Sequence, residues 1–154
     1  MGAGAGKLEE FLSRHELVGA DTMVFIYHLE DHPRYTRLTQ PLFEAWEEGR
    51  NGGVTSVITL LEILVKPKSE GREEVARDYL ELLTTYPNLT IMEIDLGLAE
   101  LAADLRARYG IRTPDALQLA AALQAGARGF ITNDGRLKRV TELEVVLMDE
   151  LLGS

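Results

Sequence analysis

Four carboxylates are the residues of this sequence whose types and positions could support chemistry: Asp21, Glu62, Asp115 and Asp134. Each lies beside an apolar segment, and a charge next to a buried segment is costly unless it is paired, hydrogen-bonded or bound to a metal. Glu62, for example, is the one polar residue in the segment 60–65. Carboxylates gathered in one place repel one another, so a shared site would favour a divalent cation such as Mg²⁺. Carboxylates that hold Mg²⁺ are typical of metal-assisted phosphoryl chemistry.

Each of these acids also has an ordinary structural explanation when it is taken singly. Asp21 could be a solvated residue at the entry to a strand, and Thr-x-x-Glu at 59–62 is typical of a capping box at a helix start. Thr-Pro-Asp at 113–115 is typical of a helix N-terminus, and Asn-Asp-Gly at 133–135 is typical of an Asx turn. The functional interpretation therefore depends on whether the fold brings the four acids together.

Segments with strand and helix character alternate along the chain, which predicts one α/β domain of three layers, α/β/α, around a central parallel sheet of four to five strands. Ligands of such sheets bind outside the carboxyl ends of the strands. We expect a flexible tail (residues 1–6) and a short helix within 1–18, and the domain itself over 19–154. The predicted strands are 21–27, 54–57, 89–94, 129–132 and 145–148. The predicted helices are 7–17, 38–46, 59–65 (ending before Pro67), 72–84, 96–109 and 113–125.

Composition excludes several classes of site and of protein. The chain has 154 residues, which is enough for one domain with a full core and too few for two ordinary ones. It contains no cysteine, so a disulfide framework, a thiolate zinc site, an iron–sulfur cluster and a cysteine nucleophile are excluded. No apolar run could span a membrane, and no basic segment precedes an apolar one as in a secretory signal. We therefore expect a cytoplasmic protein without a membrane partner.

The charge of the chain is unevenly distributed. The net charge is −9, from 16 Lys and Arg against 25 Asp and Glu, which argues against a surface coated with positive charge for nucleic-acid binding. The segment 105–140 is nevertheless basic, and its only acids are Asp115 and Asp134. Candidate contacts for a phosphate backbone are the basic residues near these acids in sequence: Arg106, Arg108, Arg112, Arg136, Lys138 and Arg139.

Four segments resemble, in order, the motifs of PIN-domain ribonucleases, and among these the VapC toxins of toxin–antitoxin pairs. The resemblance covers roughly residues 19–150. The matching segments are 21–27, 55–64, 109–122 and 130–137, and each contains one of the four acids. Two positions depart from the family pattern: Met23 stands where Asn is frequent, and Leu137 stands where Phe is frequent. The chain also carries about twenty residues before the first motif.

The resemblance implies a PIN-like fold and a site in which Asp21, Glu62, Asp115 and Asp134 hold Mg²⁺ or Mn²⁺. It implies hydrolysis of RNA phosphodiester bonds to 5′-phosphate and 3′-hydroxyl ends, with structured RNA such as tRNA as substrate. It also implies a VapB-like antitoxin as partner and a homodimer. Residues that could support the four acids through hydrogen bonds are Thr22, Ser56, Thr132 and Asn133.

Two alternatives remain open at the level of sequence. A haloacid-dehalogenase-type phosphatase also begins with an early aspartate, but it requires a second aspartate two residues later, where this chain has Met23. A degenerate domain of the same fold could bind RNA or protein without catalysis. None of the three histidines, all in the first third of the chain, is expected to act in catalysis. The stripe Val75, Tyr79, Leu82 and Leu83 could form a dimer or antitoxin surface, or it could belong to the core.

Overall fold

The computed structural model of the protein describes residues 3–153 and has a parallel sheet at its centre. The sheet has five strands in the order β3-β2-β1-β4-β5, and every neighbouring pair is parallel. The strands are β1 (Leu17–Ala20), β2 (Gly52–Ser56), β3 (Leu89–Met92), β4 (Gly129–Thr132) and β5 (Glu144–Leu147). The predicted parallel sheet of four to five strands is confirmed.

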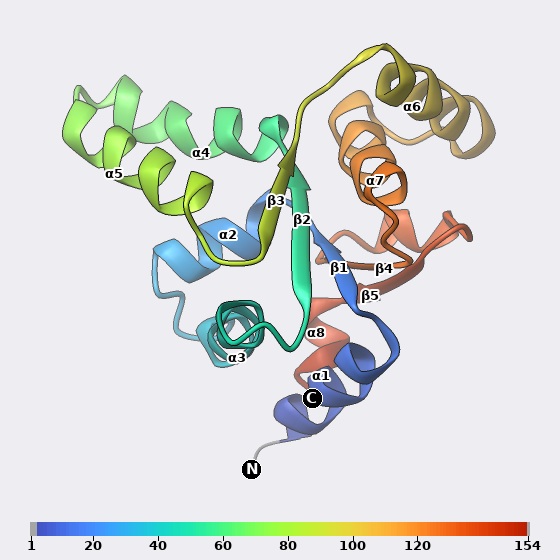
Figure 1. Ribbon diagram of the computed structural model, residues 1–154, viewed down its shortest axis with the longest axis horizontal. Coiled ribbons are helices and arrows are strands. Elements are labelled where there is room, and N and C mark those ends of the chain that lie inside the picture. The colour runs from blue at the N-terminus through green and yellow to red at the C-terminus, as the bar shows by residue number, and fades with distance from the viewer. Residues whose placement is uncertain (1–2, 154) are drawn as a thin grey trace.

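Helices cover both faces of the sheet, which confirms the predicted three-layer arrangement (Figure 1). One buried cluster packs α1 (Ala3–Arg14), α2 (Thr22–Leu29), α3 (Thr36–Glu47) and α8 (Met148–Leu151) against one face. A second cluster packs α6 (Leu96–Tyr109) and α7 (Thr113–Ala125) against the other face. The pair α4 (Val57–Ser69) and α5 (Glu73–Thr84) extends beyond the β3 edge of the sheet. A short 3₁₀ helix, η1 (Gly135–Arg139), follows β4.

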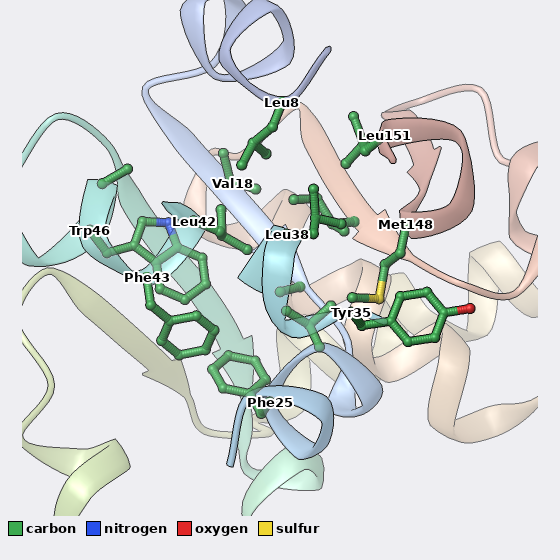
Figure 2. Close-up of a cluster of buried hydrophobic side chains, with 14 of the residues drawn as sticks. Leu8, Val18, Phe25, Tyr35, Leu38, Leu42, Phe43, Trp46, Met148 and Leu151 are labelled. Atoms are coloured by element: carbon green, nitrogen blue, oxygen red, sulfur yellow. The ribbon is translucent and has the colours of Figure 1, made fainter. Parts of the chain in front are cut away.

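Aromatic and aliphatic side chains together fill the first cluster (Figure 2). Phe43 packs edge-on against Phe25 with 5.5 Å between ring centroids, and its centroid lies 4.8 Å from that of Trp46. The Trp46 ring lies directly over the backbone of Gly53 in β2, where an added Cβ would come within 2.5 Å of it. Glycine at this strand position therefore allows α3 to approach the sheet closely.

The predicted strand at 21–27 is wrong, because these residues belong to helix α2 and the first strand is β1 immediately before it. An apolar run of this length is compatible with either a buried strand or a buried helix, and periodicity does not distinguish the two. Asp21 resolves the ambiguity in the structure, since its carboxylate accepts the N–H of Met23 and caps the helix. Asp21 therefore lies at the carboxyl end of a strand and not at the entry to one.

Helix α4 also differs from its prediction. It begins at Val57, after Ser56, whose side chain accepts the N–H of Ile58. The proposed capping box at 59–62 is therefore wrong, because Thr59 is fully buried inside the helix. The helix also continues through Pro67, where we expected it to have ended.

Smaller corrections concern the ends of other elements. The first helix ends at Arg14, earlier than predicted, because the following residues enter β1. Helix α7 is preceded by Arg112 as its cap residue, so Thr113 already lies in the first turn. The short helices η1 and α8 were not predicted. The other predicted helices and strands are confirmed to within a few residues.

The N-terminal segment contributes to the core. Residues 1 and 2 lie outside the described part of the chain, whereas Ala3 begins α1, so the expectation of a loose tail is wrong from Ala3 onward. Leu8, Phe11 and Leu12 of this helix are buried in the first cluster. The expected boundary between residues 18 and 19 falls inside β1. Within residues 3–153, every helix is too short or too polar to cross a lipid bilayer.

Candidate active site

A cavity of about 420 Å³ lies at the carboxyl ends of β1 and β4, and all four candidate acids line it. The strand order changes direction between these two neighbours, which is where ligands bind in open α/β sheets. Asp21 follows β1 and Asp134 follows β4, while α4 carries Glu62 and the first turn of α7 carries Asp115. The complete lining is Asp21, Thr22, Met23, Ile26, Tyr27, Glu62, Arg112, Pro114, Asp115, Gln118, Asn133 and Asp134.

Asp21 is the most deeply placed of the four acids. Its Oδ1 accepts the backbone N–H of Met23 at 3.1 Å, and its Oδ2 accepts the hydroxyl of Thr132. Burial raises the pKa of Asp21 to about 6, and the nearby charge of Asp115 contributes to this rise, although the two hydrogen bonds oppose it. The fold therefore holds this carboxylate where its ionised form is disfavoured without a nearby positive charge.

Asp115 and Asp134 each pair with an arginine. The guanidinium Nε of Arg112 lies 3.0 Å from Oδ2 of Asp115, and Nη2 of Arg136 lies 2.7 Å from Oδ2 of Asp134. The hydrogen bonds from Arg136 hold the pKa of Asp134 below its ordinary value. Both arginine side chains are largely exposed, so the acids keep a positive partner that solvent can reach.

Glu62 projects from the second turn of α4 toward the same cavity and accepts the hydroxyl of Thr22 at 2.5 Å. Beneath Thr22 lies Gln118, which lines the cavity and is only 4% exposed. Gln118 was not among the residues predicted to form the site. The available signal was a polar residue one turn after Asp115 in a helix that is otherwise apolar on its buried side.

The four predicted supporting residues differ in what they contact. Thr22 and Thr132 each donate to a candidate acid, Glu62 and Asp21 respectively. Asn133 lines the cavity and donates to the hydroxyl of Tyr35 at 2.9 Å, so it does not contact an acid directly. Ser56 is buried below the cavity and donates to Gln118 Oε1 at 2.6 Å.

Three of the six predicted phosphate contacts lie beside the cavity. Arg112, Arg136 and Arg139 line a hollow of about 40 Å³ that also contains Asp115. This hollow adjoins the main cavity, since Arg112 and Asp115 belong to both. A phosphate next to the acids would therefore meet a cluster of guanidinium groups.

The other three predicted phosphate contacts bind partners away from the cavity. Arg106 donates to the carbonyl of Ile111 at 2.8 Å and closes the turn before α7. Arg108 pairs with Glu142, and Lys138 pairs with Glu150 at 2.6 Å. None of the three lines the cavity or the hollow beside it.

The three histidines lie outside the cavity. His28 stacks on Phe43 with 4.0 Å between ring centroids, and its pKa is lowered by burial. His15 pairs with Glu144 at 2.6 Å. Neither of them, nor His32, lines the cavity.

A second groove of about 370 Å³ runs between α2, α4 and α5. Val75 and Tyr79 of the predicted stripe line it, whereas Leu83 is buried in the core and Leu82 is exposed and does not line the groove. Glu62 lines both this groove and the acidic cavity. An occupant of the groove would therefore reach the edge of the candidate active site.

The cavity has the donor set of a hard divalent cation, because carboxylate oxygens are the ligands that Mg²⁺ and Mn²⁺ prefer. Among residues 3–153, however, no three His, Asp or Glu side chains lie close enough together to coordinate one ion as they stand. Two of the carboxylates are turned toward Arg112 and Arg136. The buried carboxylate of Asp21, whose pKa is raised, fits a site that receives positive charge from a bound cation.

Solved structures with the same architecture include chains from three toxin–antitoxin complexes. VapBC2 from Rickettsia felis, bound to a DNA fragment from its promoter, has a chain with a TM-score of 0.67 and 19% identity, covering 85% of this chain and 98% of that one. A toxin–antitoxin complex from Klebsiella pneumoniae has a chain with a TM-score of 0.60 and 27% identity, with coverages of 86% and 96%. DNA-bound VapBC from Salmonella typhimurium has a chain with a TM-score of 0.65 and 17% identity, with coverages of 86% and 98%.

A search among curated proteins found no match. The family model of the PIN domain matches residues 20–143, which include all four acids, the last residue of β1 and the whole of β2, β3 and β4. Since this match spans most of the chain and agrees with the strand order and the acidic cavity, the protein belongs to the PIN domain family.

Proposed function

We propose that this protein is an endoribonuclease that depends on Mg²⁺ or Mn²⁺ and cleaves RNA phosphodiester bonds, leaving 5′-phosphate and 3′-hydroxyl ends. The observation that carries the proposal is the convergence of Asp21, Glu62, Asp115 and Asp134 on one cavity at the switch in strand order. These acids come from four separate segments of the chain, and a structural role in each segment does not require them to face one another.

The metal would be held by Asp21, Asp115 and Asp134, with Glu62 as a further ligand or as a base. When bound, it would supply an activated water and neutralise charge on the phosphate oxygens. Asp115 and Asp134 would exchange their arginine partners for the cation.

The residues of the chain itself would orient the reactants. Thr132 holds the carboxylate of Asp21 in place through its hydroxyl. Arg112, Arg136 and Arg139 would bind phosphates next to the cleaved bond, since they line the hollow beside Asp115. Glu62, which solvent can reach, would accept a proton from the attacking water.

We further propose that the protein acts as a VapC-like toxin on structured RNA such as tRNA, as a homodimer, and that a small VapB-like antitoxin silences it. The similar structures from Rickettsia felis, Klebsiella pneumoniae and Salmonella typhimurium support this, because each is described as a toxin–antitoxin or VapBC complex. The groove beside α5 fits a partner segment that would cover Glu62. Leu61 and Val65 of α4 are exposed apolar residues that a protein interface could bury.

The test is a cleavage assay on total tRNA with Mg²⁺ or Mn²⁺, and with EDTA in parallel. We expect cleavage by the wild-type protein with either metal, and no cleavage with EDTA or by the Asp21→Asn variant. Asp104→Asn, which changes an exposed carboxylate of α6 away from the cavity, is the matched control and should cleave normally. Equal cleavage by Asp21→Asn and the wild type would refute the proposal.

The same assay separates the alternatives. A degenerate PIN domain would bind RNA without metal-dependent cleavage and without any effect of Asp21→Asn on binding. A haloacid-dehalogenase-type phosphatase would release phosphate from small phosphomonoesters. Met23 argues against this second alternative, since it lines the cavity where that chemistry requires a carboxylate.

A further inference from the structure

A group of buried polar side chains lies directly beneath the candidate active site, with the amide of Gln118 at its centre. Every member is less than 9% exposed, and they come from α2, β2, α4 and α7: Thr22, Thr55, Ser56, Thr59 and Gln118. Buried polar groups are costly unless each is hydrogen-bonded, and all of these have partners. We call them the buried polar network.

The direction of the hydrogen bonds around Gln118 is determined by its neighbours. Ser56 Oγ accepts the backbone N–H of Ile58 at 3.1 Å and donates its own proton to Gln118 Oε1 at 2.6 Å. The amide Nε2 is thereby directed to the opposite side, where it donates to Thr22 Oγ1 at 3.2 Å and to Thr59 Oγ1 at 2.8 Å. Both protons of the amide are therefore used.

One of these bonds leads to the active site. Thr22 has a single hydroxyl proton, and its oxygen already accepts a proton from Gln118. The hydroxyl can then donate to Glu62 Oε1, which lies 2.5 Å away. The hydrogen bond from Gln118 thus helps to fix the position of the Thr22 hydroxyl, and that hydroxyl holds the carboxylate of Glu62.

The second bond leads away from the active site. Thr59 accepts from Gln118 and donates to Thr55 Oγ1 at 2.7 Å. Thr55 then donates to the carbonyl of Ala20 at 2.9 Å. This branch uses the remaining hydroxyl protons, so Thr22 is the only member of the network that donates to an acid of the cavity.

We propose that Gln118 is a positioning residue that orients the carboxylate of Glu62 through Thr22. An apolar side chain at position 118 would suffice for packing, because α7 is otherwise apolar on its buried side. The polar network is instead maintained inside the core, and Glu62 is the one acid of the cavity to which a member of the network donates a hydrogen bond. The inference rests on the proposed nuclease function, in which Glu62 takes part.

The first experiment compares Gln118→Met in two backgrounds. Methionine has nearly the length of glutamine and lacks the donor and acceptor atoms. In the wild-type background we expect Gln118→Met to lower kcat for RNA cleavage by about tenfold, with KM changed by less than about twofold. In the Glu62→Ala background we expect the same substitution to change kcat by less than about twofold, because the residue it acts through is absent.

The matched control is Asn51→Leu. Asn51 is also a buried amide, and its Nδ2 donates to the carbonyls of Leu12 and His15 at the opposite end of the sheet. Both substitutions should lower the melting temperature, but only Gln118→Met should lower kcat. An equal loss of kcat from Gln118→Met in both backgrounds would overturn the proposal, since a structural defect acts without regard to Glu62.

A second measurement does not depend on activity. NMR spectra of labelled protein should show a slowly exchanging hydroxyl proton for Thr22 in the wild type and in Asn51→Leu, and its loss in Gln118→Met. Absence of RNA cleavage by the wild type would refute the proposed function, and the NMR result would then decide the role of Gln118 by itself. A Thr22 hydroxyl proton that stays protected in Gln118→Met would overturn that role.

Discussion

The hydroxyl of Thr132 donates a hydrogen bond to the carboxylate of Asp21, although 111 positions separate the two residues in sequence. Thr132 is the last residue of β4 and Asp21 follows the last residue of β1. These strands are paired, with Ala20 opposite Ile131. The parallel register therefore brings the end of each strand to the same point, where the most buried acid of the cavity meets a donor that stabilises its charge.

Thr132→Val should impair cleavage more at low pH than at high pH. The substitution removes a donor to Asp21, so the pKa of this carboxyl should rise above its present value of about 6. Cleavage at pH 6 should fall by about tenfold, and by less at pH 8, where the carboxyl is ionised again.

The control for that substitution is Thr39→Val. Thr39 is equally buried, but its hydroxyl contacts His28 at 3.1 Å, away from the cavity. Its pH profile should match that of the wild type. A uniform loss of activity at all pH values in Thr132→Val would contradict the expected effect on Asp21.

Asp21→Asn should stabilise the metal-free protein at neutral pH while it abolishes cleavage. The pKa of Asp21 is about 6 in the folded protein, and about 3.9 is expected in the unfolded chain. Between these values the folded state binds a proton that the unfolded state has lost, so stability falls as the pH rises from about 4 to about 6 and remains lower above that. Asparagine carries no charge and can still cap α2.

Urea unfolding in EDTA checks this prediction. The free energy of unfolding of Asp21→Asn should equal that of the wild type near pH 4 and exceed it by about 1–3 kcal/mol at pH 7.5. For Asp104→Asn, on an exposed face of α6, the difference in free energy of unfolding from the wild type should not increase with pH. A difference that is constant between the two pH values would show that the charge of Asp21 is not its cause.

Removing the two arginines beside the acids should change metal binding and RNA binding in opposite directions. In Arg112→Gln and Arg136→Gln, the partner of Asp115 or Asp134 is lost, so a cation no longer competes with a guanidinium. Exposed ion pairs are weak, so Mn²⁺ should bind only about two- to fivefold more tightly. RNA should bind more weakly, with a smaller dependence on salt concentration.

Calorimetric titration with Mn²⁺ and RNA binding at several salt concentrations would measure both effects. Arg108→Gln provides the control, since Arg108 pairs with Glu142 and does not line the cavity. It should leave both affinities unchanged. Weaker Mn²⁺ binding in the Arg112 or Arg136 variants would contradict competition between arginine and cation.

Gly53→Ala should destabilise the protein through the contact between β2 and Trp46. The added Cβ would lie 2.5 Å from the indole ring, and the fully buried ring cannot move without displacing its neighbours. We expect a loss of about 1–3 kcal/mol in urea unfolding. Gly97→Ala is the matched control: nothing lies within 3.5 Å of its added Cβ in helix α6, and it should be neutral or stabilising by up to about 1 kcal/mol. Similar values for the two variants would contradict the close approach seen here.

Much of the fold could be predicted from local sequence patterns. The helix at 96–109 has its apolar residues at helical spacing and ends at Gly110, which adopts the left-handed conformation in the structure. Strand β4 is a short apolar run between glycine and polar residues and was predicted correctly. The length of the first segment and the glycine and polar residues that flank the second distinguish helix from strand here.

The first strand could not be assigned in this way. Leu17–Ala20 is only four residues long and follows a helix without a strong break, while α2 is apolar enough to resemble a strand. Leu17–Ala20 becomes a strand because it pairs with both β2 and β4, and those partners lie far along the chain. Tertiary contacts therefore override the local preference.

The sequence by itself determined the identities of the four acids and their order, and these were enough to predict a shared acidic site. Only the tertiary structure decided what each acid contacts: Arg112 and Arg136 pair with two of them, Thr132 holds Asp21, and Gln118 supports Glu62 through Thr22. The physical reason is that the chemistry available to a site depends on residue types, which the sequence specifies directly. Hydrogen bonding and burial depend instead on distances between segments, which only the packed fold defines.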